Sequence, residues 1–215
     1  KRFLEGLENK FINSDKLQVV FQSANKSKID LGKKKKMITF VGKLNRSKGY
    51  DIFGKAVIKI LDKHKNWTAN VIGDEQRDKI NFLHKRLVNH GFLEHDKVIE
   101  IYKKTNIAVV CSRWEEPFGR TSLEASSNGC AVIISNKGGL PETITNGVIL
   151  KNLSIKHLYL SIDKLIKNTN IRKNLQKLSL KNFFLTHSYV SKLIDKFRDE
   201  KFGNLSLFNT KKNKK

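Results

Sequence analysis

The chain has 215 residues, of which 39% are hydrophobic, enough for one globular domain with a substantial core. Its longest purely apolar runs, 107–111 and 130–134, are far shorter than the roughly 20 residues that span a bilayer. The net charge of +23 comes mostly from Lys scattered along the chain, which disfavours nucleic acid as a partner and suits anionic lipid headgroups or phosphorylated ligands.

The N-terminal residues predict the end of an upstream domain. Residues 1–11 carry apolar side chains at helical spacing, and residues 16–21 have the composition of a strand. Residues 22–36 are polar and charged, as is typical of a linker, and no initiating Met opens the sequence. We therefore expect residues 1–30 to be the end of a truncated domain followed by a linker.

From Met37 onward, short apolar strands alternate with amphipathic helices. The expected strands are 37–42, 67–73, 88–93, 107–111, 131–135 and 147–150, and the expected helices are 50–64, 77–87, 95–105, 119–129, 154–167 and 172–184. This alternation predicts an α/β domain over residues 31–186, with a Rossmann-like parallel sheet covered by helices on both faces. Residues 187–215 are expected to form a C-terminal helix, over 189–200, and a basic tail.

The cysteines and histidines do not indicate a metal centre. Cys111 and Cys130 each border an apolar run, where buried free thiols belong. The six histidines show neither a pair at i, i+4 spacing nor Cys partners at zinc-finger spacing. No metal site is predicted.

The first informative loop runs from Gly42 to Gly49. In parallel sheets, ligands lie beyond the carboxyl ends of the strands, so the loops that follow strands are the candidate site. Glycines at both ends allow backbone to approach a ligand closely, and Lys43, Arg46 and Lys48 supply cations before a helix. The loop predicts an anion site, although an ordinary basic loop remains the alternative because the P-loop spacing is absent.

The second informative loop is "RWEEPFGRTSLEA", which ends in a predicted helix. The free N–H groups at the start of this helix attract a phosphate, and Glu116 and Glu124 flank that position. Carboxylates accept hydrogen bonds from diols, such as those at both ends of a nucleotide sugar. The alternative is that Glu116 is a solvated loop charge and Glu124 a charge favoured by the helix dipole.

Five segments together resemble a known family. "FVGKLNRSKG", "VIGD", "GF", "SRWEEPFGRTSLEA" and "NKGGLPE" occur in the order and spacing of the retaining glycosyltransferases of family 4. The sequence is similar to the C-terminal, nucleotide-sugar-binding half of their two-domain GT-B fold, from about Met37 to Leu150. The E-x7-E element formed by Glu116 and Glu124 is the most specific part of the match.

The resemblance implies roles for particular residues. Lys43 and Lys48 would contact the diphosphate, with Lys43 in place of the usual Arg, and Glu116 would hold the sugar hydroxyls, so these three are the candidate catalytic residues. Glu124 would hold the ribose, and Phe92 would lie near the base. Arg120 replaces a common aliphatic residue. The candidate substrate-binding set is Gly42, Arg46, Gly73, Phe92, Phe118, Gly119, Arg120, Thr121, Ser122 and Glu124.

The implied activity is transfer of a hexosyl group, with retention, from a UDP-, GDP- or ADP-sugar to an acceptor hydroxyl, without metal or cofactor. The acceptor, a glycan or lipid-linked glycan of the cell surface, would reach the site through the N-terminal domain, so residues 1–215 alone are expected to bind donor but transfer little. A cytoplasmic location, with peripheral contact at the inner face of an anionic membrane, fits this role. The alternatives are a non-catalytic nucleotide-sugar-binding module, a GT-B phosphorylase or an epimerase.

Overall fold

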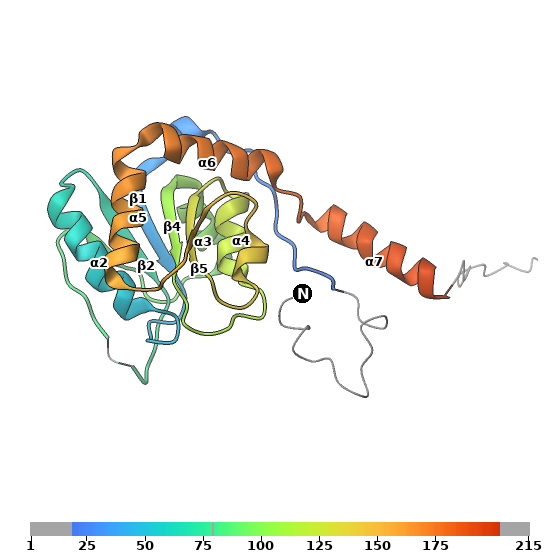
Figure 1. The fold of residues 1–215 in the computed structure, drawn as a ribbon, viewed down its shortest axis with the longest axis horizontal. Helices are drawn as coiled ribbons and strands as arrows, with labels where there is room; N and C mark the ends of the chain where they lie inside the picture. The colour runs from blue at the N-terminus through green and yellow to red at the C-terminus, as the bar shows by residue number, and fades with distance from the viewer. Residues whose placement is uncertain (1–18, 79, 203–215) are drawn as a thin grey trace, which may run out of the picture.

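The computed structural model describes residues 19–78 and 80–202, which contain one parallel six-stranded sheet. Its strand order is β3-β2-β1-β4-β5-β6, the order of doubly wound nucleotide-binding folds. Figure 1 labels the four central strands, β1, β2, β4 and β5. The strands are β1 (Lys35–Val41), β2 (Thr68–Ile72), β3 (Leu87–Asn89), β4 (Thr105–Val110), β5 (Ala131–Ser135) and β6 (Val148–Leu150). The predicted α/β, Rossmann-like class is therefore confirmed.

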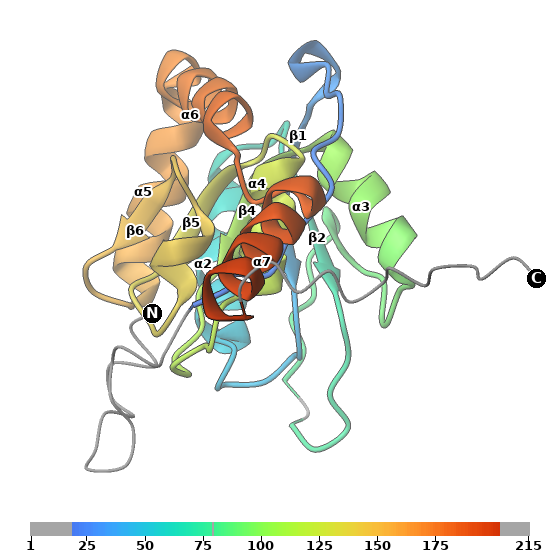
Figure 2. The same ribbon diagram turned by 90° about the vertical axis from the view of Figure 1, so that its right-hand side faces the viewer.

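Helices cover both faces of the sheet, as Figure 2 shows from the side. On one face α2 (Tyr50–Lys63) and α5 (Ile155–Lys167) pack on β1, β4 and β5 through residues such as Phe53 and Ile162. On the other face α3 (His95–Lys104) and α4 (Arg120–Ser127) bury residues such as Tyr102 and Ala125. Two-sided burial explains why every residue of β4 and β5 is buried.

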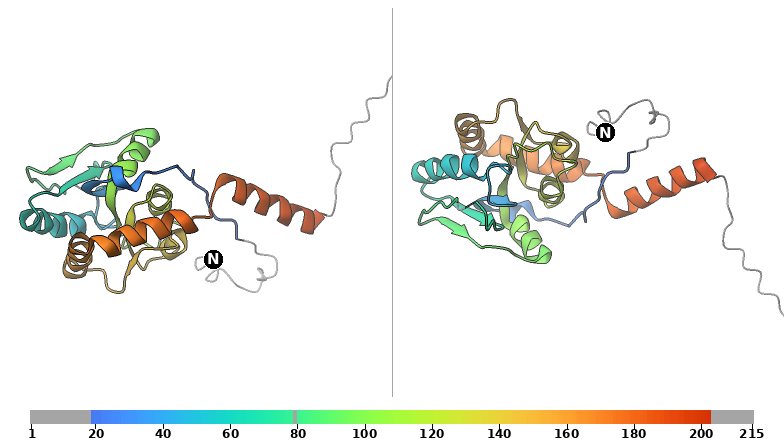
Figure 3. Two further views of the ribbon diagram at one scale, coloured as in Figure 1. Left: turned by 90° about the horizontal axis from the view of Figure 1, so that it is seen from above. Right: turned by 90° about the horizontal axis from the view of Figure 1, so that it is seen from below.

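The C-terminal helices close one side of the domain and then leave it. The helix α6 (Thr169–Asn182) contacts α4 and α5, and α7 (His187–Phe202) extends away from the body of the domain (Figure 3). Between residues 19 and 202, apart from residue 79, no helix is both long enough and apolar enough to cross a membrane. Cys111 and Cys130 are free and buried, as predicted.

The topology places two loops next to each other. The direction of strand addition reverses between β1 and β4, which are neighbours in the sheet although two other strands separate them in sequence. At such a switch point the loops after the two strands diverge and leave a crevice at their carboxyl ends. Here those loops are 42–49, after β1, and 111–119, after β4.

The predicted helix at 77–87 is wrong. The described residues of this segment contain no helix, and its last residue, Leu87, begins β3. The Arg86 guanidinium donates hydrogen bonds to the carbonyl oxygens of Leu61, His64 and Trp67, and the Phe82 ring lies directly over Gly54 of α2. Leu83, which a helical stripe would have buried, is 83% exposed. Contacts with α2 and with the residues just after it therefore hold the described part of the segment in an irregular, non-helical form.

The segment before β1 also differs from the expected strand at 16–21. Residues 19–21 are not in a strand, and residues 16–18 and the helix expected over 1–11 lie outside the described residues. Phe21 instead stacks on Phe118 at 5.6 Å between ring centroids, and the Ala24 N–H donates to the Leu185 carbonyl. The predicted linker at 22–36 contains the short 3-10 helix η2 (Leu31–Lys33), and β1 begins at Lys35, where it pairs with β4. The domain boundary at residue 30 stays a prediction.

Candidate functional site

The loop after β1 presents Lys48 to the crevice through an asparagine turn. The Asn45 side-chain oxygen accepts hydrogen bonds from the Ser47 hydroxyl, at 2.8 Å, and from the Lys48 backbone N–H, at 3.0 Å. Gly49 then has φ +73°, and a Cβ atom at this position would overlap the Cys111 carbonyl oxygen. A glycine is required here because the loop after β1 touches the end of β4.

Lys48 pairs with Glu116 across the two loops. The ammonium of Lys48 lies 2.5 Å from Oε1 of Glu116, and the Glu116 side chain is only 12% exposed. Burial strengthens the attraction between these charges because little water screens them. A cation and an acid that are 68 positions apart in sequence thus meet at the switch point.

The start of α4 lies beside this pair. Gly119, at φ +109°, precedes the helix and has no side chain to cap it. A cavity of about 110 Å³ adjoins the helix start, and its lining includes Gly42, Lys48, Glu116, Gly119, Arg120 and Thr121. Six of the predicted site residues therefore share one cavity, where unpaired N–H groups and a lysine favour an anion.

Glu124 lies in a second, adjoining cavity of about 240 Å³. Its Oε1 atom accepts from Nε of Arg120 at 2.6 Å and lies 3.0 Å from Nε2 of His95, at the start of α3. The Glu124 side chain is 7% exposed, so these partners compensate for much of the cost of burying its charge. Arg120 lines both cavities and therefore connects the surroundings of Glu116 with those of Glu124.

The remaining predicted residues lie outside these two cavities. Arg46 lines a third, open cavity of about 610 Å³ beside α2, and Lys43 is exposed. The Ser122 hydroxyl is buried and already engaged, since it donates to the Gly119 carbonyl oxygen at 2.8 Å and lies 2.6 Å from the Thr143 hydroxyl oxygen. The Phe118 ring packs among apolar side chains. Gly73 packs against Gly42, and Phe92 is 67% exposed.

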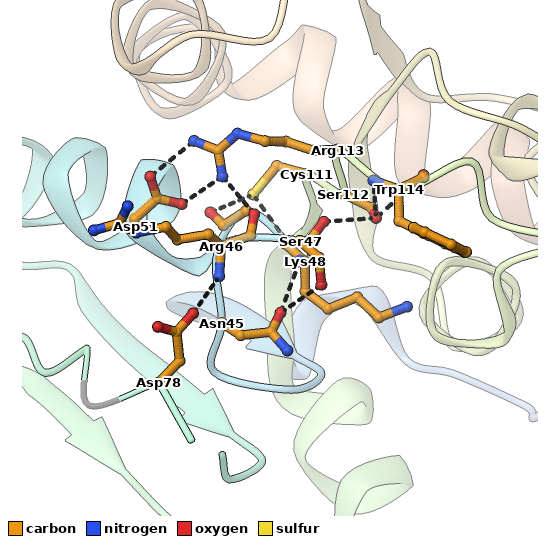
Figure 4. A network of polar contacts seen from close by, with 11 residues as sticks. Asn45, Arg46, Ser47, Lys48, Asp51, Asp78, Cys111, Ser112, Arg113 and Trp114 are labelled. Atoms are coloured by element: carbon orange, nitrogen blue, oxygen red, sulfur yellow. Dashed lines mark hydrogen bonds and ion pairs between the residues drawn. The ribbon is translucent and has the colours of Figure 1, made fainter. Parts of the chain in front are cut away.

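Two side chains that sequence reasoning missed belong to this region. His95 contacts Glu124, and Arg113 binds the loop after β1 (Figure 4). Arg113 lies in the segment "SRWEEPFGRTSLEA", three residues before Glu116, and this place in the motif could have drawn attention to it. His95 carries no comparable signal. No cluster of three potential metal ligands occurs within 19–78 and 80–202, and metal independence stays a prediction.

The sheet order defines a Rossmann-like domain, and a lysine and an acid pair in the crevice at its switch point. The family model for glycosyl transferases group 1 matches residues 21–181, and the chain belongs to this family. It is 30% identical over 162 residues to the spore coat protein SA of Bacillus subtilis, covering 67% of this chain and 43% of that protein. It is 28% identical over 147 residues to the lipopolysaccharide core biosynthesis mannosyltransferase LpsB of Rhizobium meliloti, covering 63% and 42%.

Solved structures agree on the fold. A glycosyltransferase from Rickettsia africae matches with a TM-score of 0.78 at 22% identity, over 94% of this chain and 62% of that one. The C-terminal domain of LpcC, a glycosyl transferase group 1 protein from Francisella tularensis, matches with a TM-score of 0.62 at 26% identity, over 75% and 93%. The fold is the C-terminal half of a GT-B glycosyltransferase. The chain spans less than half the length of the curated relatives named above.

Proposed function

We propose that this domain binds a nucleotide diphosphate sugar and serves a retaining hexosyltransferase of the family 4 type. The observation that carries the proposal is the Lys48–Glu116 pair beside the start of α4, at the switch point of the sheet. A cation, free N–H groups and an acid are the groups that a diphosphate and the hydroxyls of its sugar require. A solved relative from Anabaena, HepE, was crystallised with UDP-glucose and matches with a TM-score of 0.63 at 20% identity, over 79% of this chain and 50% of HepE.

The pair must separate when a donor binds. The cavity around it, about 110 Å³, is too small for a nucleotide sugar, because small-molecule pockets measure roughly 300–1,000 Å³. We infer that Lys48 exchanges Glu116 for the diphosphate, and that Glu116 then accepts hydrogen bonds from the sugar hydroxyls. Each charge keeps a partner, so the exchange avoids a buried unpaired charge.

The nucleoside end of the donor would extend toward Glu124. Oε1 of Glu124 already accepts hydrogen bonds, whereas Oε2 has none among the hydrogen bonds recorded for the described residues. A carboxylate has capacity for further donors, and the two hydroxyls of a ribose would supply them. Thr121 and the Gly119 region would then face the phosphates, and Lys43, Phe92 and the Phe118 amide stay assigned by family resemblance.

The chemical barrier lies in breaking the bond between the anomeric carbon and the diphosphate oxygen. Lys48 and the N–H groups of α4 would stabilise the charge that develops on the leaving diphosphate, by about 3–4 kcal/mol per well-placed donor. The acceptor hydroxyl would attack from the face that the diphosphate leaves and pass its proton to that phosphate. This order of events gives retention without a nucleophile from the protein.

A panel of UDP-, GDP- and ADP-sugars, read by thermal shift and calorimetry with and without EDTA, tests donor binding by the 215-residue chain. At least one donor should raise the melting temperature, and EDTA should not reverse it. If none binds, the proposal fails. Transfer is tested in a longer protein that joins this domain to an acceptor-binding domain: incubation with donor and a glycan acceptor, followed by proton NMR of the product, separates retaining transfer from inversion, epimerisation and phosphorolysis.

A further inference from the structure

The loops after β1 and β4 are joined through one carbonyl group. The Ser47 carbonyl oxygen lies within hydrogen-bond distance of three donors: the backbone N–H groups of Arg113, at 2.8 Å, and Trp114, at 3.2 Å, and the Ser112 hydroxyl, at 3.2 Å. Figure 4 shows this arrangement beside Lys48. The backbone of the loop that carries Glu116 is therefore hydrogen-bonded directly to Ser47, the residue that precedes Lys48.

The Arg113 side chain adds a second connection, because it binds one residue before Lys48 and one residue after it. Its guanidinium donates to both carboxylate oxygens of Asp51, at 2.6 and 2.8 Å, and also to the Arg46 carbonyl. Asp51 lies in the first turn of α2, and hydrogen bonding from Arg113 is the main cause that lowers its pKa. A planar guanidinium with several donors fixes direction as well as distance.

These contacts bracket Lys48 in the sequence. Arg46 and Ser47 precede it and Asp51 follows it, and all three are bound by the single residue Arg113. Arg113 is also only three residues from Glu116, the acid with which Lys48 pairs. One side chain thus relates the position of the cation to the position of the acid.

We propose that Arg113 is a positioning residue that holds Lys48 at the diphosphate position opposite Glu116. The inference rests on the proposed function for the identity of the ligand, but the restraint on the loop is a property of the free domain. The Arg113 side chain is 40% exposed, and isolated exposed ion pairs contribute little to stability. Its loss should therefore change ligand binding more than melting temperature.

Affinities for UDP and UMP, or for GDP and GMP if the panel selects guanine, test this role. In Arg113→Ala we expect diphosphate affinity to fall about tenfold and monophosphate affinity less than about twofold, because loss of the restraint acts through one charge-assisted contact. Asp51→Asn should reproduce the loss, and Arg113→Lys should restore part of it. Because the effect passes through Lys48, Arg113→Ala should have no further effect in a Lys48→Ala background.

Equal losses of affinity for the diphosphate and the monophosphate, or additive losses in the double variant, would overturn the inference.

Amide hydrogen exchange gives a second test that needs no ligand. The Lys48 and Gly49 N–H groups bond within the turn, to Asn45 and Arg46, and their exchange should accelerate about tenfold in Arg113→Ala as the turn opens more often. Arg198→Ala, on α7, is the matched control and should match wild type.

Unchanged exchange at Lys48 and Gly49 would also refute the inference. Failure of the wild-type chain to bind any nucleoside diphosphate would instead refute the proposed function. The two failures are therefore distinguishable.

Discussion

Arg120 donates from Nε to Oε1 of Glu124 at 2.6 Å, and its side chain forms part of the wall between the Glu116 and Glu124 cavities. The pair spans one turn of α4, so the helix itself sets its geometry. Residue 120, whose role the family pattern left undefined, is thus a direct partner of the second acid.

Glu124→Gln should weaken nucleotide binding with little change in fold. The amide keeps the shape of the carboxylate but loses its charge, and hydrogen bonds to charged groups are worth about 1.5–3 kcal/mol, which is about 10- to 150-fold in affinity. Titration calorimetry with the preferred nucleoside diphosphate measures the loss.

A deoxyribose analogue identifies the contact. If Glu124 holds the ribose, wild type should bind the 2′,3′-dideoxy nucleotide as weakly as Glu124→Gln binds the normal one, and the variant should lose little more. Glu100→Gln, an exposed acid of α3, is the control. If Glu124→Gln instead loses as much affinity as wild type when the dideoxy nucleotide replaces the normal one, Glu124 does not hold the ribose.

Lys48→Ala should reduce turnover about 100- to 1,000-fold, the range seen when one donor to a developing anion is removed. The melting temperature should also fall, because the variant leaves the Glu116 carboxylate, only 12% exposed, without its cation, so turnover is measured well below that temperature. Steady-state kinetics with donor and acceptor measures turnover in a longer protein that joins this domain to an acceptor-binding domain. Lys156→Ala on α5 controls for loss of positive charge. Near-normal turnover in Lys48→Ala would contradict its assignment.

Gly49→Ala should destabilise the domain more than Gly91→Ala. Both glycines have positive φ, but a Cβ atom at Gly49 would overlap the Cys111 carbonyl, whereas none of the neighbouring atoms lies within 4 Å of a Cβ atom at Gly91. Backbone strain alone costs about 1–2 kcal/mol. Urea unfolding should therefore show about that loss at residue 91 and a larger loss at residue 49; equal losses would mean that the loop moves away from β4 at little cost.

Asp163→Asn should lower stability by about 1–3 kcal/mol at neutral pH, because Asp163 of α5 binds Lys63 at the end of α2, His64 directly after it, and Lys167 of its own helix. Burial works to raise the pKa of this carboxyl, but hydrogen bonds from His64, Lys167 and Lys63 outweigh it and lower the pKa to about 2.

The pH dependence of this loss follows from the sign of the shift. A folded-state pKa below the unfolded value of about 3.9 stabilises the domain at higher pH, and the contribution disappears as pH falls through about 2. Urea unfolding should give a constant gap between wild type and Asp163→Asn above about pH 5, where Asp163 is ionised in both states, and a shrinking gap below it. Asp96 is fully exposed, so the Asp96→Asn control should show no difference in stability from wild type at any of these pH values.

The strands were predictable because both faces of a parallel sheet are buried. That burial produces the continuous apolar runs at 107–111 and 130–134, and loops that follow such runs must meet at one edge of the sheet. The proximity of Lys48 and Glu116 could thus be expected from topology, and the structure places the pair at the crevice.

Other features depend on tertiary contacts that carry no local signal. The apolar residues of 77–87 fit a helical spacing, but Phe82 packs on Gly54 and the described residues before Leu87 are irregular. Similarly, Ser122 has the residue type of a phosphate ligand, yet its hydroxyl bonds to Thr143 because that face of α4 is turned toward the interior. Which face of a helix meets the crevice depends on packing rather than on spacing alone.

The stacking of Phe21 on Phe118 brings the segment before β1 into direct contact with the loop that carries Glu116. Phe118 lies between Glu116 and the start of α4, so a displacement of residue 21 would shift the backbone that carries the acid. The segment before β1 therefore contacts the Glu116 loop directly, as well as leading into the strand that it precedes.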